Sequence, residues 1–428
     1  MRSPSVPRVG PDCASVDPGL NCRGPTVSEV EENQIKWAVR CNGLTRENEV
    51  EIYLDANATT ALSATACEAL FAALEGGPQN PSSAHQFGTR ARALIERARQ
   101  DIADLLGKVD SENVVLTSGG TEANNILVRG FAELPSAIFC TAVEHPSVLN
   151  PVTFLGGAVL PVDNNGILNI KYAIDAVSRR KDRDFILLSI QAANSETGII
   201  QPLDYIIKKI REVREDVFVM VDAAQAFGRV PLIVECIDAL TISGHKLHAP
   251  AGTGVLYLSD RMLEVLPPVI HGGGQERGFR PGTQNVAGAA SLAAALGERI
   301  SKFSQHVEKL GQLRHRLETR ILELVPTARI IGASIARVPN TSNIMFPGID
   351  AQALLARLDA EGVYCSTGSA CSSARPEASP VLKAMGMSER EASSCLRFSV
   401  SVDNTQEEMD AAAQIVGKCV SEGLRIGL

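Results

Sequence analysis

Two apolar runs, each followed by polar residues, decide the fold: VFVMVD at residues 217–222 and ALTISGHK at residues 239–246. The apolar residues of each run are continuous rather than alternating, which is typical of strands buried on both faces of a mainly parallel sheet. The first run ends at Asp222 and the second leads into Lys246. We therefore expect a buried aspartate and a lysine, each placed at the end of a central strand.

Lys246 and Asp222 are the pair of side chains that pyridoxal phosphate (PLP) requires. A lysine amine forms a Schiff base with the aldehyde of PLP, and a carboxylate keeps the pyridine nitrogen protonated so that the ring accepts electrons. Ser243 and His245 offer polar contacts to the phosphate or the ring. A solvated surface lysine is the alternative interpretation, which the nearby Gly and Pro residues disfavour because they indicate a positioned loop.

A bound phosphate needs backbone N–H groups, and the stretch SGGTEANN at residues 118–125 offers them. Its two glycines allow a tight turn after the apolar run at 114–116, and a helix is expected to begin at Thr121. Free N–H groups and the positive end of the helix dipole then point at an anion. We predict that Gly120 and Thr121 bind the phosphate, although such a stretch alone also occurs in ordinary turns.

Three further polar residues follow predicted strands. Asn194 could hydrogen-bond a ring hydroxyl and a substrate carboxylate, and Gln225 could reach the phenolic oxygen of the ring. His145 could stack on the ring and shuttle protons. An ordinary turn, or a purely structural histidine, is the alternative for each of them.

Composition and charge narrow the class of function. The 428 residues carry a formal net charge of −8, which disfavours a nucleic-acid-binding face. No apolar run approaches the roughly 18 residues that span a bilayer. The ten cysteines contain no CxxC pair, so neither a metal site nor a disulfide scaffold is predicted. Thiols spread in this way indicate a reducing compartment, which we expect to be the cytoplasm.

The alternation of short apolar runs with helical patterns predicts an α/β fold with a mostly parallel sheet. We expect a large domain at 63–299 and a small α+β domain built from 49–62 and 300–428. Residues 1–48 contain five prolines and no long apolar stretch, which indicates a disordered N-terminal arm.

These motifs, with others further along the chain, resemble the PLP-dependent cysteine desulfurases of the class V aminotransferase-like family. The resemblance runs from residue 53 to residue 399. The motifs that carry it are YLDANATT (53–60), NPSS (80–83), SGGTE (118–122), VEH (143–145), NSETG (194–198), DAAQ (222–225), SGHK (243–246), GGGQERGFRPGTQN (272–285) and SACSS (369–373).

The resemblance implies an aspartate-aminotransferase-like fold with a seven-stranded sheet. It also implies a homodimer in which Thr283 reaches the phosphate of the neighbouring subunit's cofactor, and a substrate carboxylate held by Asn194 and Arg397. L-cysteine is the implied substrate, and a sulfur-acceptor protein is the implied partner, as in iron–sulfur cluster assembly. Only 31 residues follow Arg397, fewer than in desulfurases whose C-terminal tail grips a scaffold protein, so delivery to that scaffold is not predicted.

Cys371 lies in the small, polar stretch STGSACSSAR at 366–375, where access favours a reactive thiolate. We predict that Lys246 removes the α-proton of the substrate and that Cys371 attacks its sulfur. Cys371 then keeps that sulfur as a persulfide, and alanine is the product. Cys365 ends an apolar run and is predicted to be a core thiol. An inert loop cysteine is the alternative for Cys371.

Two other functions stay open at this point. A selenocysteine lyase would also keep a loop cysteine, and the stretches GQERGFRPGT (274–283) and SPVL (379–382) resemble that enzyme. A non-catalytic sulfur-relay partner would keep the fold without turnover. Such a protein has no physical need for a lysine, an aspartate, a histidine and a loop cysteine in these motifs.

Overall fold

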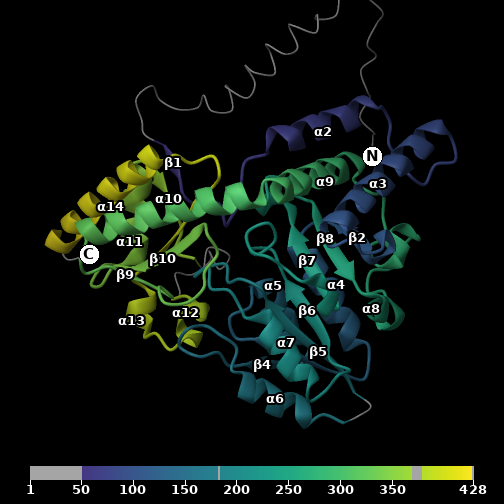
Figure 1. The fold of residues 1–428 in the computed structure, drawn as a ribbon, viewed down its shortest axis with the longest axis horizontal. Helices are drawn as coiled ribbons and strands as arrows, with labels where there is room; N and C mark the ends of the chain where they lie inside the picture. The colour runs from purple at the N-terminus through teal and green to yellow at the C-terminus, as the bar shows by residue number, and fades with distance from the viewer. Residues whose placement is uncertain (1–50, 182–183, 369–377, 427–428) are drawn as a thin grey trace, which may run out of the picture. The chain divides into compact units, whose positions relative to one another are not determined.

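The computed structural model describes residues 51–181, 184–368 and 378–426, so the predicted arm at 1–48 and Cys371 lie outside the described residues. Its central feature is a seven-stranded sheet (Figure 1). β8 runs antiparallel to both of its neighbours and the other pairs are parallel, which confirms the predicted mostly parallel α/β sheet. From one edge to the other the strands are β2 (Val114–Thr117), β8 (Gly254–Leu258), β7 (Ala239–Ser243), β6 (Phe218–Asp222), β5 (Phe185–Gln191), β3 (Ser136–Thr141) and β4 (Ala158–Leu160).

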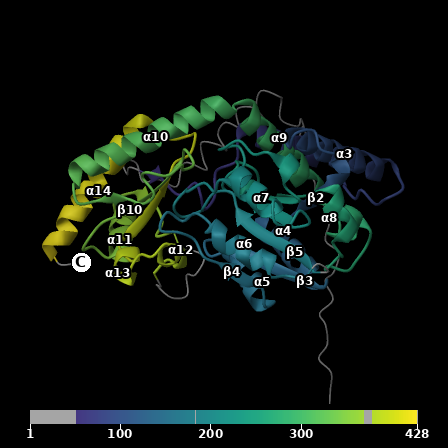
Figure 2. The same ribbon diagram turned by 60° about the horizontal axis from the view of Figure 1, so that its bottom comes forward.

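The central strands are apolar throughout because helices cover both faces of the sheet (Figures 1 and 2). On β6, Val219 and Val221 pack on one side, while Phe218 and Met220 pack on the other. The first side is covered by α3 (Gln86–Leu105), α6 (Ile170–Ser178), α7 (Leu203–Arg211) and α9 (Val286–Ser301), and the second by α4 (Gly120–Ala132), α5 (Pro146–Phe154) and α8 (Asp260–Val265). Since no face meets solvent, the strands show no polar alternation.

A second apolar core gathers residues from both ends of the described chain. Ile52 and Leu54 share it with residues between 310 and 420. Its strands are β1 (Ile52–Tyr53) paired with β11 (Val363–Tyr364), and the antiparallel set β9 (Arg329–Ile330), β10 (Thr341–Met345) and β12 (Cys395–Ser399). Its helices are α10 (Phe303–Leu324), α11 (Ala351–Ala360) and α14 (Gln406–Ile426). The domain boundaries at 62–63 and 299–300 stay predictions.

Shorter elements complete the described chain. Helix α2 (Ala64–Glu75) packs along α9. The other short helices are α12 (Pro380–Ala384) and α13 (Glu389–Ala392), and 3₁₀ turns lie at η1 (Ser111–Asn113), η2 (Val234–Cys236), η3 (Gly244–Lys246) and η4 (Gln275–Gly278).

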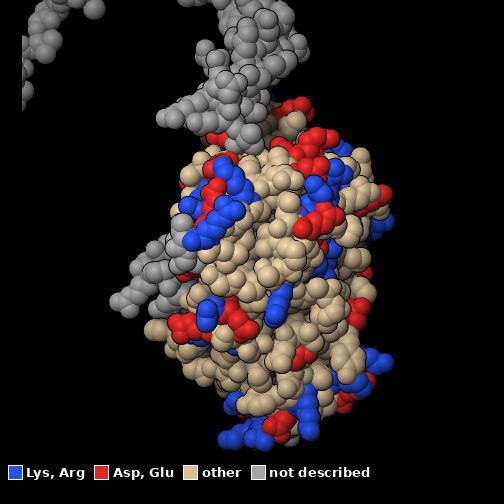
Figure 3. Space-filling view, turned by 90° about the vertical axis from the view of Figure 1, so that its left-hand side faces the viewer, with Lys and Arg blue, Asp and Glu red and all other residues tan. Residues whose placement is uncertain are grey.

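The surface around α14 mixes charges of both signs (Figure 3). Exposed ion pairs join α10 to α14 through Arg316 and Asp410, and tie Lys418 of α14 to Glu361. Such pairs stabilise a fold by little, roughly 0–1 kcal/mol each. Within the described ranges, no helix has both the length and the apolar character needed to cross a membrane.

Candidate active site

Asp222 is the last residue of β6 and is buried at the carboxyl end of the strand. Two N–H groups hold its carboxylate: the Nδ2 of Asn124 lies 2.9 Å from Oδ2, and the backbone N of Ala224 lies 2.9 Å from Oδ1. Hydrogen bonds from both sides keep the carboxylate in one orientation. The predicted buried aspartate at a strand end is therefore present.

Asn124 of α4 links Asp222 to neighbouring strands and helices. Its Nδ2 also donates to the Oγ of Ser147 at 2.8 Å, and its Oδ1 accepts from the Oγ1 of Thr241 at 2.8 Å. The Oγ of Ser147 lies 2.8 Å from the Nδ1 of His145. A continuous set of hydrogen bonds thus joins the carboxylate of Asp222 to the imidazole of His145.

Sequence reasoning missed Asn124, Ser147 and Thr241. One signal could have found Asn124: it is a polar residue on the face of α4 where Ala123, Ile126 and Leu127 are buried. A buried amide needs partners for its donors and its acceptor, so its neighbours are expected to be polar groups of the site.

His145, Lys246 and Asp222 lie within electrostatic reach of one another. Lys246 ends the 3₁₀ turn η3 directly after β7. Burial lowers the pKa of His145 and the charge of Lys246 lowers it further, while Asp222 opposes both effects. Burial and Lys246 also lower the pKa of His245. Imidazoles with lowered pKa values are neutral near pH 7, a state suited to stacking and to accepting a proton.

The glycine-rich stretch at 118–120 lies at the amino end of α4, beside Ser243. Gly119 has φ 147°, a conformation that favours glycine, and no side chain caps the helix. A Cβ on Gly120 would meet the Cβ of Ser243 at 3.7 Å. An uncapped helix start lined by small residues and a hydroxyl is an anion cradle, so these residues fit a phosphate.

Gln225 is held from behind by a buried guanidinium. Its Oε1 accepts a hydrogen bond from Arg229, and its Nε2 donates to the backbone O of Asn57 at 3.0 Å. Arg229 also donates to the backbone O of Lys246 at 3.0 Å. Arg229 therefore holds the side chain of Gln225 and the backbone of Lys246, and no sequence motif pointed to it. The contact of Gln225 with a phenolic oxygen stays a prediction.

Arg397 on β12 is a second buried cation of the site. Its Nη2 lies 2.5 Å from the Oδ1 of Asp55, and its Nη1 lies 3.1 Å from the backbone O of Ser195. Its buried Nε has no hydrogen-bond partner among the described residues. A guanidinium presents a planar fork of donors that suits a carboxylate, and a contact of Arg397 with the substrate carboxylate stays a prediction.

The side chain of Asn194 shapes the turn in which it lies. Its Oδ1 accepts from the backbone N of Glu196 at 2.9 Å and of Thr197 at 2.8 Å, and its Nδ2 donates to the backbone O of Val143 at 3.1 Å. The alternative interpretation, an ordinary turn residue, thus describes much of what Asn194 does. A contact with substrate or ring, through the remaining Nδ2 hydrogen, stays a prediction.

Of the two cysteines considered as the nucleophile, Cys365 is described and Cys371 lies outside the described residues. Cys365 is partly buried after β11, and burial raises the pKa of its thiol far above the usual range. Such a thiol stays protonated and is a poor nucleophile.

Thr283, the residue predicted to reach the phosphate of the neighbouring subunit, is described and exposed. Within the described ranges, no cluster of three or more His, Cys, Asp and Glu residues is arranged to hold a metal ion.

Glu144 is a buried carboxyl next to the site. Its Oε1 accepts from the backbone N of Gln191 at 2.7 Å and from the Oγ1 of Thr141 at 3.1 Å, whereas its Oε2 has no partner among the described residues. Burial and the nearby charge of Asp222 raise the pKa of Glu144 to about 8. The folded protein therefore binds a proton here at neutral pH that the unfolded chain, with a carboxyl pKa of about 4.3, releases.

Glu144→Gln is expected to change how stability depends on pH. Because the folded pKa is raised, the stabilisation from this proton is full below about pH 4.3 and is lost as pH rises through 8. The amide mimics the protonated carboxyl and does not titrate. The free energy of unfolding of the variant should therefore rise relative to that of the wild type as pH increases over this window, by on the order of a few kcal/mol. Urea unfolding of the cofactor-free proteins measures it, and parallel stability curves would contradict it.

Known proteins resemble this chain over most of its length. The Aminotransferase class-V family model matches residues 52–412. Cysteine desulfurase IscS of Dictyoglomus turgidum is 35% identical over 383 residues, 87% of this chain and 95% of the relative. A cysteine desulfurase of Nostoc sp. is 38% identical over 379 residues, 86% and 92% of the two chains. The X-ray structure of a NifS-like protein from Rickettsia africae has a TM-score of 0.80 at 32% identity, covering 87% and 99%. The matched region contains the site described above.

Proposed function

The chain belongs to the class V aminotransferase family, and from that premise we propose that it is a PLP-dependent cysteine desulfurase, which converts L-cysteine into L-alanine and keeps the sulfur on Cys371. The observation that carries the proposal is the hydrogen-bond network that runs from Asp222 through Asn124 and Ser147 to His145. Lys246 lies close enough to this network for its charge to lower the pKa of His145. A network that served only to stabilise the fold would not need a lysine beside it, whereas PLP does.

The described residues fit the cofactor. Asp222 would hold the ring nitrogen, His145 would cover the ring, and Gln225 would face the phenolic oxygen. The phosphate would be held by Gly120, Thr121, Ser243 and His245. When bound, PLP supplies an aldehyde that takes up the amino group of cysteine and a ring that withdraws electrons from its Cα.

Five side chains carry the steps of the reaction. Arg397, with Asn194, binds the carboxylate of cysteine and so orients its Cα–H bond. The amine of Lys246, in its neutral form, takes the α-proton, and His145 exchanges protons with the substrate. The thiolate of Cys371 then attacks the substrate sulfur. A sulfur–sulfur bond forms, the carbon–sulfur bond breaks with its electron pair moving to Cβ, and Cβ takes up a proton. The ammonium of Lys246 then returns a proton to Cα, which completes alanine and leaves Lys246 neutral again.

The persulfide on Cys371 must be passed on, so we include a sulfur-acceptor protein as a partner. A place in iron–sulfur cluster assembly would use such a partner. We also propose that two copies of the chain associate, so that Thr283 of each reaches the phosphate in the other. The free thiols among the described residues support a reducing, cytoplasmic setting.

The wild-type protein is expected to form alanine from L-cysteine in the presence of a reductant. L-selenocysteine serves as the second substrate, because selenide leaves without a thiolate to attack it, and both enzyme classes should therefore turn it over. Steady-state alanine release with each substrate measures the preference. Turnover of selenocysteine with none of cysteine would replace the desulfurase by a selenocysteine lyase, and turnover of neither by the PLP-bound protein would leave the non-catalytic alternative.

A further inference from the structure

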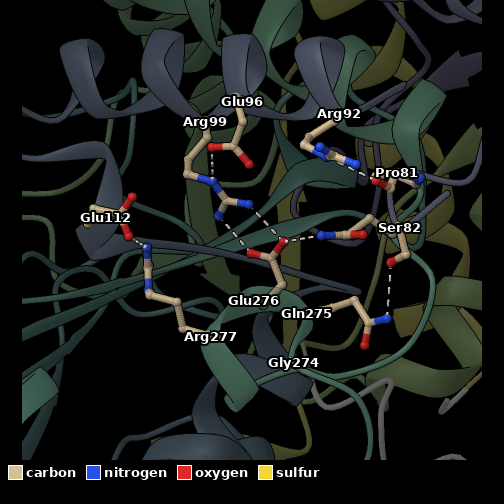
Figure 4. Close-up of a pocket in the computed structure, with 11 residues that line it drawn as sticks. Pro81, Ser82, Arg92, Glu96, Arg99, Glu112, Gly274, Gln275, Glu276 and Arg277 are labelled. Carbon is tan, nitrogen blue, oxygen red and sulfur yellow. Dashed lines mark hydrogen bonds and ion pairs between the residues drawn. The ribbon is translucent and has the colours of Figure 1, made fainter. Parts of the chain in front are cut away.

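A buried carboxylate helps to attach the segment between α8 and α9, which contains Thr283, to the sheet. Glu276 is 4% exposed, and its side chain pairs with Arg99 of α3 through two hydrogen bonds of 2.7 and 2.8 Å (Figure 4). Two parallel N–H···O bonds fix both partners in position and orientation. The pair lies beside a cavity of about 420 Å³ lined by residues of α3 and of this segment.

The backbone at Glu276 has a shape that side chains normally avoid. Glu276 has φ 48° and Arg277 has φ 54°, and neither is a glycine. Left-handed conformations are costly for such residues, so the surrounding structure must hold them. Two consecutive residues in this conformation indicate that contacts elsewhere in the segment offset the energetic cost of its backbone path.

Glu276 also covers the free edge of the sheet at β2. Its Oε2 accepts from the backbone N of Leu116 at 2.8 Å. Arg99 donates to the backbone O of Val114 at 2.6 Å, and Arg277 donates to the same oxygen at 3.2 Å. These bonds satisfy edge groups that would otherwise be unpaired. Glu276 and Arg277 therefore attach this segment to the edge strand of their own subunit.

Thr283 is exposed, yet both of its chain neighbours are held. The backbone N of Gly282 donates to the Oε1 of Gln275 at 3.0 Å, and the Nε2 of Gln284 donates to the Oε1 of Glu276 at 3.2 Å. Contacts on both sides of Thr283 restrict the path of the backbone that carries its hydroxyl. The anchor after Thr283 depends on Glu276.

We propose that Glu276, held by Arg99, is a positioning residue that presents Thr283 to the phosphate of the neighbouring subunit's PLP. This inference rests on the proposed cofactor and dimer, which it deepens by naming the device that builds the shared phosphate site. The carboxylate acts through Thr283 and does not itself touch the phosphate.

Glu276→Gln is expected to raise the dissociation constant for PLP about tenfold, since one amide cannot accept all the bonds of the carboxylate. Glu112→Gln is the matched control: Glu112 pairs with Arg277 beside the same cavity at 2.6 Å, but its side chain is 68% exposed. The control should bind PLP as the wild type does. Fluorescence titration of the folded cofactor-free dimers measures both, and unchanged affinity in Glu276→Gln overturns the inference.

Mixed dimers separate positioning from general damage. In the first, Lys246→Ala is in one chain and Glu276→Gln in the other, so the remaining lysine site receives Thr283 from a chain with intact Glu276. In the second, one chain carries both substitutions, and the remaining site receives Thr283 from the altered chain. We expect weakened PLP binding only in the second. Equal weakening in both, or weakening only in the first, overturns the inference.

Gln284→Ala provides a test if Glu276→Gln does not fold. It removes only the bond that follows Thr283, so PLP binding should weaken by about threefold with the stability of the cofactor-free protein unchanged. Full affinity in this variant would count against the inference. Because affinity is read without turnover, a wild type that binds PLP but forms no alanine would count against the proposed function alone.

Discussion

Lys246→Ala is expected to lower the rate of alanine formation from L-cysteine by about 10⁴-fold or more. The substitution removes the amine that bonds the cofactor and the base that takes the α-proton, so both tasks fail together. Reduction with borohydride followed by peptide mass spectrometry should find the cofactor on the Lys246 peptide of the wild type. The variant should carry no covalent cofactor.

Lys209→Ala is the matched control for this prediction. Lys209 lies on α7 and pairs at the surface with Glu212 at 2.7 Å. Since surface ion pairs contribute little, this variant should keep wild-type activity and the covalent cofactor. Covalent PLP on a different lysine, or an active Lys246→Ala protein, would show that the site has been assigned to the wrong residue.

Cys371→Ala is expected to abolish protein-bound persulfide and nearly all turnover of L-cysteine, while PLP binding stays intact. The thiolate is needed only after the α-proton has left, so binding of PLP does not depend on it. Labelling of persulfide with an alkylating reagent, followed by mass spectrometry, measures the first effect. Part of the selenocysteine turnover should survive, because selenide is a better leaving group than sulfide.

Cys365→Ala tests the choice between the two thiols. Cys365 is partly buried and its thiol pKa is raised by burial, so the variant should keep its activity and lose stability on the order of 1 kcal/mol. If Cys365→Ala removed the persulfide while Cys371→Ala kept it, the nucleophile would be Cys365. Thermal unfolding of both variants checks that each protein is folded.

The positions of Asp222 and Lys246 were predictable because they depend on local patterns. A continuous apolar run of five or so residues indicates a buried strand, and the polar residue that ends it must lie at the edge of the sheet. The helix after the two glycines was expected at Thr121, and α4 begins at Gly120. Motifs of this kind depend only on residues that are close together in the sequence, so they can be predicted without the tertiary structure.

The links among these residues were not predictable in the same way. Asn124 contacts groups 23, 98 and 117 positions away in the chain. Gln225 was predicted from its motif, but the guanidinium of Arg229 that orients it belongs to no predicted site. Asn194 was predicted to contact substrate, yet three of its hydrogen bonds, with Glu196 and Thr197, form the turn around it.

The amino-acid sequence alone thus determined the type of sheet, the strand ends at which chemistry occurs and the family to which the motifs point. Only the tertiary structure decided which polar atoms meet, including the amide of Asn124 beneath Asp222 and the carboxylate of Glu276 behind Thr283. The reason is physical. Apolar burial depends on composition along a short stretch of chain, whereas a hydrogen bond needs two atoms within about 3 Å at a fitting angle. That condition is met only after distant segments have packed.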